Sequence, residues 1–154
     1  MAARPGDGER SRAANTEAIE DYVKAIYALS RERTGPVQNG AVAARLGVAP
    51  GTATAMLKKL DGLGLVEHVP YKGVTLTPAG EKVALEVIRH HRLIEAYLSE
   101  ALGMPTDLVH AEAEVLEHHI SERLEELIAA KLGEPSHDPH GSAIPGPDLK
   151  LPEA

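Results

Sequence analysis

Apolar side chains recur at helical spacing through most of this chain, and the pattern predicts a mainly α-helical fold with one small β-hairpin. In the first such segment, Tyr22, Val23 and Ile26 fall on one face with a period near 3.6 residues. Gly47 indicates the end of one helix, and Pro50 indicates the start of the next, because proline suits the first turn of a helix. The predicted helices span residues 16–33, 39–47, 50–64, 78–102 and 106–132.

Two short runs between the third and fourth helices are predicted to form the hairpin. Leu65–Val69 and Val74–Thr77 have strand-like composition, and Pro70–Gly73 supplies the turn. Three helices followed by a hairpin are typical of a winged helix-turn-helix, which we assign to residues 15–78.

The remaining segments complete the predicted domain organisation. Residues 1–14, rich in Arg, Gly, Ala and Ser, are expected to be disordered. Residues 79–133 are expected to form a C-terminal helical dimerisation domain, because its two helices are too thin to hold a core without a second subunit. Residues 134–154 turn to Gly, Pro, His and Asp and are expected to form an extended tail.

Composition narrows the class of protein. The 154 residues include no Cys, which removes disulfides and thiolate metal ligands, but they include 8 His and 23 Asp and Glu. No apolar run reaches the length of a transmembrane helix, and the polar N-terminus lacks the apolar core of a secretory signal. We therefore expect a cytoplasmic protein whose metal ligands can only be imidazole and carboxylate groups.

Net charge differs between segments. The whole chain carries −7 with His neutral, yet residues 36–78 hold four basic and two acidic residues, whereas residues 79–154 hold six basic against 15 acidic. The predicted winged helix-turn-helix is therefore the part suited to nucleic acid. Its basic excess is modest, so useful affinity for DNA requires a dimer.

The start of the third predicted helix and the tip of the hairpin carry candidate DNA contacts. Side chains in the first turn of such a helix reach base edges, its N-terminus favours a phosphate, and a wing contacts the adjacent backbone. A winged-helix module that binds protein instead of DNA is the alternative. The candidate DNA-binding residues are Pro50, Gly51, Thr52, Thr54, Lys58, Lys59, Tyr71 and Lys72.

Four metal-ligand types share one face of the last predicted helix. At 100° per residue, His110, Glu114, Glu117 and His118 fall within an arc of about 100°. This arc borders a predicted core stripe of Leu116, Ile120, Leu124 and Leu127. Carboxylates one turn apart repel each other, and a divalent cation would reverse that effect.

Two other helices offer similar groups. His91 and Glu95 are four residues apart on the preceding helix, and Asp21 adjoins the apolar face of the first helix. Four carboxylates in this set would be neutralised by two divalent cations. Nitrogen and oxygen donors without sulfur suit Mn²⁺, Fe²⁺ or Zn²⁺, and the carboxylate-rich set favours Mn²⁺.

These motifs resemble the metal-dependent repressors of the diphtheria-toxin-repressor type, and among them the short manganese transport regulators. The resemblance covers about residues 16–147 and rests on IEDYVKAIYAL, VAARLGVAPGTATAMLKKLDGLGLV, LTPAGEKVA, HHRLIEAYL and above all VHAEAEVLEHHIS and DPHGSAIPGP. It implies a homodimeric repressor that binds operator DNA when loaded with Mn²⁺ or Fe²⁺ and controls genes of metal uptake or toxicity.

The resemblance also implies ligand sets. By motif position, Asp21, Glu114, Glu117 and His118 are the primary ligands, and His91, Glu95 and His110 form a second site. In the manganese branch, His91 joins the primary cluster instead.

Departures from the family pattern refine this expectation. Asp21 and Glu114 stand where the iron branch has Met and Cys, which favours manganese. Lys24 stands where the manganese branch commonly has Glu, which favours two separate sites over a close binuclear pair. Because the chain ends at Ala154, we also expect it to lack the SH3-like domain of longer members.

We expect the metal to tie the first helix, through Asp21, to the dimerisation helices and so to fix the spacing of the recognition helices. An Fe²⁺-dependent repressor and a metal-independent winged-helix regulator are the alternatives. A metal-dependent hydrolase is disfavoured, because the chain has no HExxH helix, nucleophile elbow or Gly-rich phosphate loop. We therefore expect no enzymatic activity.

Overall fold

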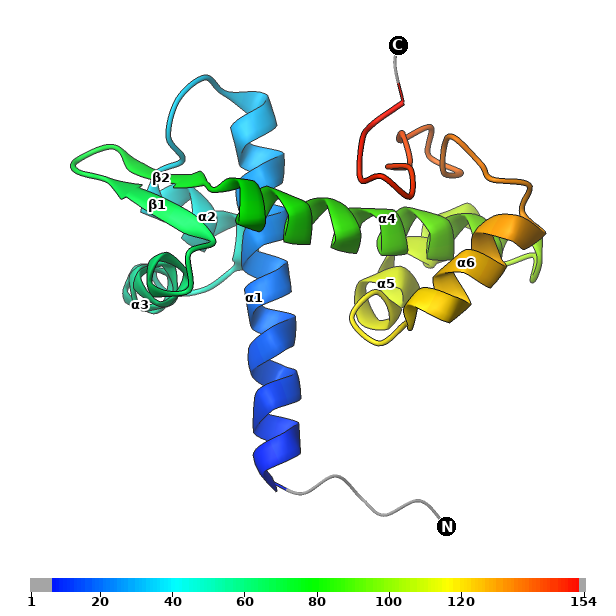
Figure 1. The fold of residues 1–154 in the computed structure, drawn as a ribbon, viewed down its shortest axis with the longest axis horizontal. Helices are drawn as coiled ribbons and strands as arrows, with labels where there is room; N and C mark the ends of the chain where they lie inside the picture. Colours follow the sequence, from blue (N-terminus) through cyan, green and yellow to red (C-terminus); the bar gives the residue numbers. More distant parts are fainter. Residues whose placement is uncertain (1–6, 153–154) are drawn as a thin grey trace. The chain divides into compact units, whose positions relative to one another are not determined.

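The computed structural model describes residues 7–152 and divides the chain into two compact units, one ending at Ala84 and one beginning at Leu85 (Figure 1). The mainly helical fold with one hairpin is confirmed, with six helices in the described residues in place of the five predicted. The elements are α1 (Asp7–Glu32), α2 (Asn39–Leu46), α3 (Pro50–Gly62), β1 (Val66–Val69), β2 (Gly73–Leu76), α4 (Pro78–Glu100), α5 (Thr106–Leu116) and α6 (Glu122–Lys131).

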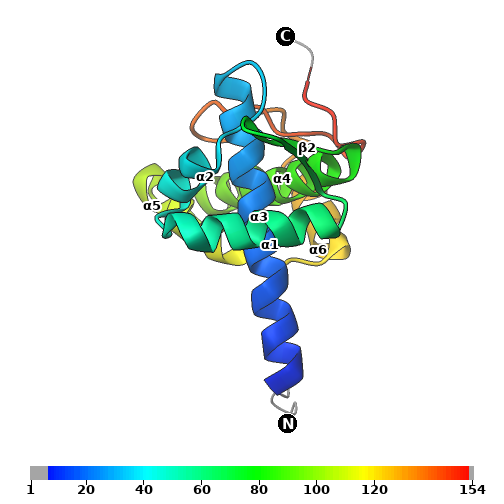
Figure 2. The ribbon, with the colours of Figure 1, turned by 90° about the vertical axis from the view of Figure 1, so that its left-hand side faces the viewer.

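The first unit is the predicted helix-turn-helix followed by its hairpin. Helix α2 ends at Gly47, whose φ of 65° is the left-handed conformation that commonly terminates a helix, and α3 begins at Pro50. Figure 2 shows α3 lying across the direction of α1. The three helices and the hairpin enclose one core, made of Tyr22, Ile26, Leu29, Val37, Val42, Ala43, Ala53, Leu57, Leu60, Val66 and Val74.

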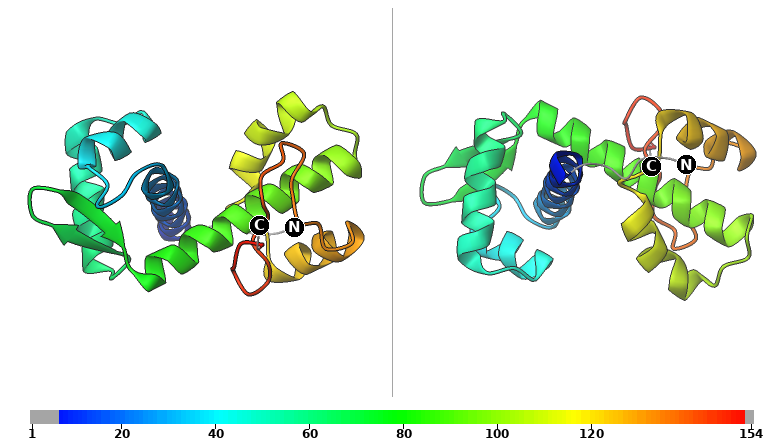
Figure 3. Two further views of the ribbon diagram at one scale, coloured as in Figure 1. Left: turned by 90° about the horizontal axis from the view of Figure 1, so that it is seen from above. Right: turned by 90° about the horizontal axis from the view of Figure 1, so that it is seen from below.

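The hairpin is fixed to the rest of this unit by backbone contacts. Strands β1 and β2 pair antiparallel, with Val66 opposite Leu76 and Val69 opposite Gly73. Val37 and Val74 exchange two backbone hydrogen bonds of 2.8 Å. A Cβ on Gly73 would lie 1.9 Å from the carbonyl oxygen of Val37, so only glycine fits there. The loop between the strands projects at the edge of the unit (Figure 3).

Two sequence predictions about helix boundaries are wrong. Helix α1 begins at Asp7, not near residue 16, so residues 7–14, which were expected to be disordered, are helical in the structure. That segment holds Glu, Arg and Ala, which have high helix propensity. The rest of the predicted disordered segment, residues 1–6, lies outside the described residues.

The predicted helix over residues 106–132 is two helices. Helix α5 ends at Leu116, and α6 begins after Ser121, whose side chain accepts a hydrogen bond of 3.1 Å from the backbone N–H of Leu124. Serine is a strong N-cap. The negative charges of Glu122 and Glu125 in the first turn interact favourably with the positive end of the helix dipole. The continuous apolar period concealed this break.

The second unit packs the rest of α4 with α5, α6 and the tail. Leu93, Ile128, Ala129 and Ile144 form one small core. A second core is formed by Ile94, Leu98, Val109 and Ala113.

The C-terminal segment is integrated into this unit. Ile144 and Pro145 are buried, and Arg89 donates a hydrogen bond of 2.7 Å to the carbonyl of Pro145. Arg92 likewise donates to the carbonyl of Ala143. Two arginines of α4 thus hold the tail, which was expected to be extended and whose described residues form mainly turns and bends. Within residues 7–152, no helix has the length and apolarity needed to cross a bilayer.

Candidate metal centre and DNA-binding surface

His91 lies at the centre of a group of metal-ligand side chains in the second unit. Its imidazole is buried, with Nδ1 2.6 Å from Oε2 of Glu117. On the other side of the ring, Nε2 lies 3.2 Å from Nδ1 of His110 and makes a close ion pair with Glu95. Both carboxylates are almost fully buried. Each ring nitrogen of His91 therefore faces a different carboxylate.

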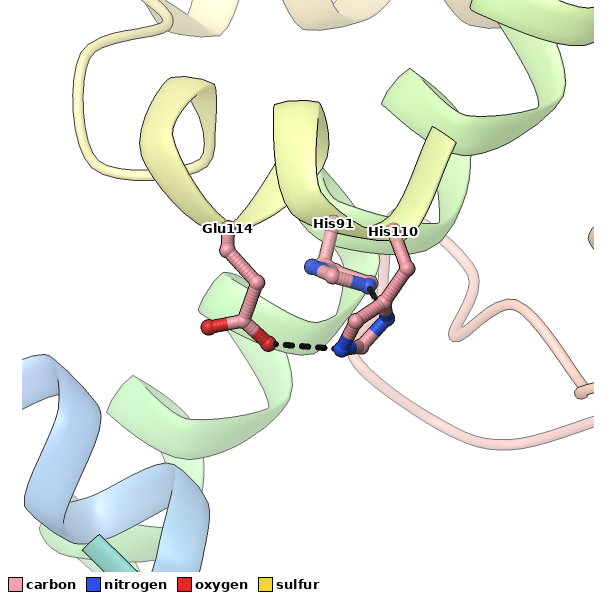
Figure 4. Close-up of side chains that lie close together, drawn as sticks. All are labelled: His91, His110 and Glu114. Atoms are coloured by element: carbon pink, nitrogen blue, oxygen red, sulfur yellow. Dashed lines mark hydrogen bonds and ion pairs between the residues drawn. The ribbon is translucent and has the colours of Figure 1, made fainter. Parts of the chain in front are cut away.

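Helix α5 supplies the exposed edge of this group. His110 and Glu114 are one turn apart, with Nε2 of His110 3.0 Å from Oε1 of Glu114. Figure 4 shows both side chains descending from α5 toward His91 on α4. One ligand atom from each of the three residues lies within 4.8 Å of the other two. The side chains of His110 and Glu114 are 62% and 44% exposed, so an ion could reach this edge from solvent.

The loop after α5 places Glu117 and His118 beside this group. Glu117 is the C-cap of α5 and turns inward, and Nε2 of His118 lies 3.4 Å from its Oε1. Neither residue lies within α5, but Glu117 keeps helical φ and ψ, and its backbone N–H donates to the carbonyl of Ala113, so it continues the last turn of the helix. Asp21, half-buried on α1, is described with the first unit, so its convergence with these residues stays a prediction.

The tail contributes two candidate ligands that the sequence interpretation missed. Asp138 and His140 meet Glu95, and one ligand atom from each lies within 4.8 Å of the others. Oδ1 of Asp138 accepts hydrogen bonds from the backbone N–H groups of His140 and Ser142, at 2.9 and 2.8 Å, which fix the turn. The sequence signal for these two ligands is the DPHG segment, which entered the sequence analysis only as part of a motif for the family resemblance.

The environment of Glu95 indicates whether a cation fits among Glu95, Asp138 and His140. Among the described residues, Oε2 of Glu95 is buried and makes no hydrogen bond, although Nδ1 of His140 lies only 2.7 Å away. A buried carboxylate oxygen that lacks a donor is costly unless a cation or a donor satisfies it. A hard divalent ion with mixed oxygen and nitrogen ligands satisfies both groups. The donor set therefore fits the metal predicted from the sequence.

A buried ion-pair network lies next to the metal-ligand side chains and joins α4 to α6. Glu125 on α6 accepts from Arg89 in a close ion pair and lies 2.8 Å from Nε2 of His90. Burial acts to lower the pKa of His90, but the hydrogen bond and charge of Glu125 outweigh it, and the pKa is raised. Burial acts to raise the pKa of Glu125, but His90 and Arg89 outweigh it, and this pKa is lowered. The network ties α4 to α6.

The predicted core stripe of the last helix is largely exposed. Leu116, Leu124 and Leu127 are 40%, 47% and 60% exposed, and they line an apolar groove of about 380 Å³. Ile120, which is half-buried, lines the same groove. These leucines therefore present an apolar surface that the described part of a single chain does not cover.

The candidate DNA contacts lie on the first unit. Thr52, Lys58 and Lys59 are exposed on α3, as are Pro50 and Gly51 at its start. Thr54 is half-buried, and its Oγ1 lies 3.5 Å from Nδ2 of Asn39, so its hydroxyl is partly engaged within the protein. Tyr71 and Lys72 are exposed at the tip of the hairpin.

Comparison with known proteins finds similarity along both units. Residues 15–74 match the family model for the iron dependent repressor, N-terminal DNA binding domain. Residues 77–146 match the model for the iron dependent repressor, metal binding and dimerisation domain.

Curated relatives are transcriptional regulators. The transcriptional regulator MntR of Escherichia coli is 43% identical over 106 residues, which are 69% of this chain and 67% of that protein. The iron-dependent repressor IdeR of Mycobacterium tuberculosis is 33% identical over 130 residues, which are 84% of this chain and 56% of that protein.

Solved structures agree with this similarity. A manganese-dependent transcriptional repressor in complex with manganese has a TM-score of 0.81 and 44% identity, covering 88% of this chain. The match covers 62% of that repressor, so this chain spans less than two thirds of its length.

Proposed function

Because this chain belongs to the iron-dependent repressor family, we propose that it is a manganese-responsive transcriptional repressor that controls genes of metal-ion homeostasis. The observation that carries this proposal is the meeting of His91 with Glu95, His110 and Glu117 in a domain matched to metal binding and dimerisation. Buried carboxylates crowded around one imidazole repel each other, and a cation removes that repulsion.

Two ions per protomer are proposed. The first is held by Glu114, Glu117 and His118, with Asp21 of α1 as the fourth ligand. The second is held by Glu95 with Asp138 and His140 of the tail, and His91 and His110 lie within reach of both. When bound, each ion supplies positive charge that neutralises the carboxylates and fixes their segments to one another.

Manganese is favoured by the donor chemistry. All the proposed ligands are oxygen or nitrogen atoms, and carboxylates suit the harder Mn²⁺. Fe²⁺ is the second candidate, supported by the resemblance to IdeR and by the tail ligands, which set Glu95 apart as a separate site. Intrinsic affinities favour later metals, so metal availability in the cell decides between them.

Coupling to DNA is proposed to pass through Asp21. An ion that binds Asp21 and the second unit together fixes how the two units are oriented. A homodimer then presents two recognition helices at a fixed spacing, which must match half-sites about one DNA turn, or a multiple of it, apart. Without metal, the protein samples other orientations of the two units. DNA binding is then weakened, because the conformational entropy of those orientations is lost on binding.

The apolar groove on α4 and α6 is proposed to be covered by a second copy of the chain. Its leucines are exposed in the single chain, and the matched family model is named for dimerisation. Contact with cytoplasmic double-stranded DNA falls to the exposed residues of α3 and the wing, namely Pro50, Gly51, Thr52, Thr54, Lys58, Lys59, Tyr71 and Lys72.

Metal-titrated DNA binding tests the function. A duplex is first selected from a random pool by the wild-type protein with Mn²⁺, and its binding is then followed by fluorescence anisotropy at matched free Mn²⁺, Fe²⁺, Co²⁺ and Zn²⁺. We expect Mn²⁺ to tighten binding at least tenfold and Asp21→Ala to abolish that gain, whereas Glu17→Ala on the same helix keeps it. Equal affinity with and without metal would refute the proposal.

A further inference from the structure

The tip of the wing carries a tyrosine where the turn geometry favours glycine. The backbone N–H of Lys72 donates 3.0 Å to the carbonyl of Val69, which closes a four-residue turn. Pro70 occupies the second position, and Tyr71 the third with a φ of 63°. Proline followed by a residue of positive φ is the pattern of a type II turn, whose third position prefers Gly or Asn. A tyrosine there is strained.

Within the described part of the first unit, no packing contact of the ring offsets this strain. Tyr71 has a relative exposure of 106%, so its ring packs against no neighbour among the residues that the structure describes. The hairpin cannot relax easily, because Gly73 lies against Val37 and the pair Val37–Val74 is hydrogen-bonded on both sides. Strain that is held by the surrounding structure and is not repaid by packing points to a function for the side chain.

The surroundings of the tip identify the chemistry of its partner. A polar hollow of about 220 Å³ adjoins the turn, and its lining contains two potential cations and no carboxylate. The lining residues are Gln38, Asn39, His68, Tyr71, Lys72 and Gly73. Hydrogen-bond donors and positive charge around an exposed aromatic ring suit a sugar–phosphate backbone and its groove.

We propose that Tyr71 enters the minor groove of DNA beside each half-site and packs its ring against the sugars there. The inference rests on the proposed function, because α3 then occupies the major groove and the wing reaches the next groove along. A ring in the minor groove is sensitive to the width of the groove and to the groups on its floor. A·T pairs narrow the groove, and the 2-amino group of guanine obstructs its floor. The wing would thus extend specificity to bases that α3 does not touch.

The decisive variant is Tyr71→Gly, which should stabilise the fold while weakening DNA binding. Relief of the positive φ should raise Tm by roughly 3 °C, and loss of the ring should weaken binding of the selected duplex about tenfold. The matched control is Glu134→Gly. Glu134 also has a positive φ, of 54°, and lies after α6 in the second unit. This control should raise Tm similarly and leave DNA affinity unchanged.

Base changes in the flanks test the groove assigned to Tyr71. Flanking A·T pairs are replaced by G·C and then by inosine·C, which lacks the 2-amino group. Wild type should lose affinity on G·C and regain it on inosine·C, whereas Tyr71→Gly should bind all three duplexes alike. Unchanged DNA affinity in Tyr71→Gly would overturn the inference and leave a protein partner as the occupant. If wild type binds no duplex with any metal, the proposed function fails instead.

Discussion

Nδ1 of His91 lies 2.6 Å from Oε2 of Glu117, and both side chains are buried. The opposite nitrogen of the same ring faces Glu95 and His110. This imidazole therefore connects the residues proposed for the first ion with those proposed for the second. Groups that orient metal ligands are worth about 10–100-fold in metal affinity, so this single residue should influence both ions.

His91→Ala should weaken Mn²⁺ binding at both ions by at least about tenfold. The substitution removes a ligand for one ion and the group that orients Glu117 for the other. Isothermal titration calorimetry and the electron paramagnetic resonance of free Mn²⁺ both measure this. His68→Ala, which removes an exposed histidine from the wing, should bind metal as wild type does. A His91→Ala protein with one unchanged ion would show that the two sets are independent.

His140→Ala should reduce the number of bound Mn²⁺ ions from about two per protomer to about one. The tail ligand Nδ1 of His140 lies 2.7 Å from a buried oxygen of Glu95 that has no hydrogen-bond donor, and alanine leaves that site without its imidazole. Equilibrium dialysis with metal analysis gives the stoichiometry. His137→Ala, three residues earlier and exposed, is the control. Retention of two ions by His140→Ala would exclude the tail from metal binding.

Glu125→Gln should destabilise the metal-free protein by about 3 kcal/mol near pH 5.5, because it leaves buried Arg89 without its counter-ion. Glu126→Gln, at an exposed neighbour, should have little effect. Urea unfolding in the presence of a chelator measures both variants.

The loss caused by Glu125→Gln should depend on pH. The pKa of Glu125 is lowered below 4.5 in the fold, so its contribution is present above pH 4.5 and lost as pH falls through the folded pKa. The pKa of His90 is raised above 6.5, so its contribution is complete below pH 6.5 and lost as pH rises through the folded pKa. The difference between wild type and variant should therefore peak between these limits. A difference that is constant from pH 3 to 9 would argue against the network.

Leu127→Asp should convert a dimer into a monomer. This leucine is 60% exposed and lines the apolar groove, and a charge buried there would be costly without a partner. Leu63→Asp introduces the same charge at a leucine 53% exposed in the first unit, and it should leave the dimer intact. Sedimentation velocity distinguishes the two species. A dimeric Leu127→Asp protein would place the subunit contact elsewhere.

Local signals made most of the first unit predictable from sequence. Gly47 and Pro50 mark a helix end and a helix start, and both lie where they were expected. The hairpin followed from its strand composition and from the turn at Pro70. These features depend on the backbone preferences of single residues, which sequence displays directly.

The second unit was harder to predict because its critical features are non-local or compete with a stronger pattern. Ser121 is a good N-cap, but the apolar period on both sides of it suggested one continuous helix. Asp138 and His140 approach Glu95 only because α4 and the tail pack together, which no sequence spacing reveals. The exposed leucines have the same helical spacing as buried core residues. They differ only in that no other described segment of the single chain packs over them.

The arginine-held tail has a further consequence. Helix α6 precedes the tail, and the described residues of the tail itself form turns and one isolated bridge between His137 and Ala143. Its place therefore depends on a few carbonyl anchors and on the two side chains it extends toward Glu95. An ion bound there would hold the tail against α4, and the irregular backbone of the tail would then be cut by proteases more slowly when the metal is bound than when it is absent.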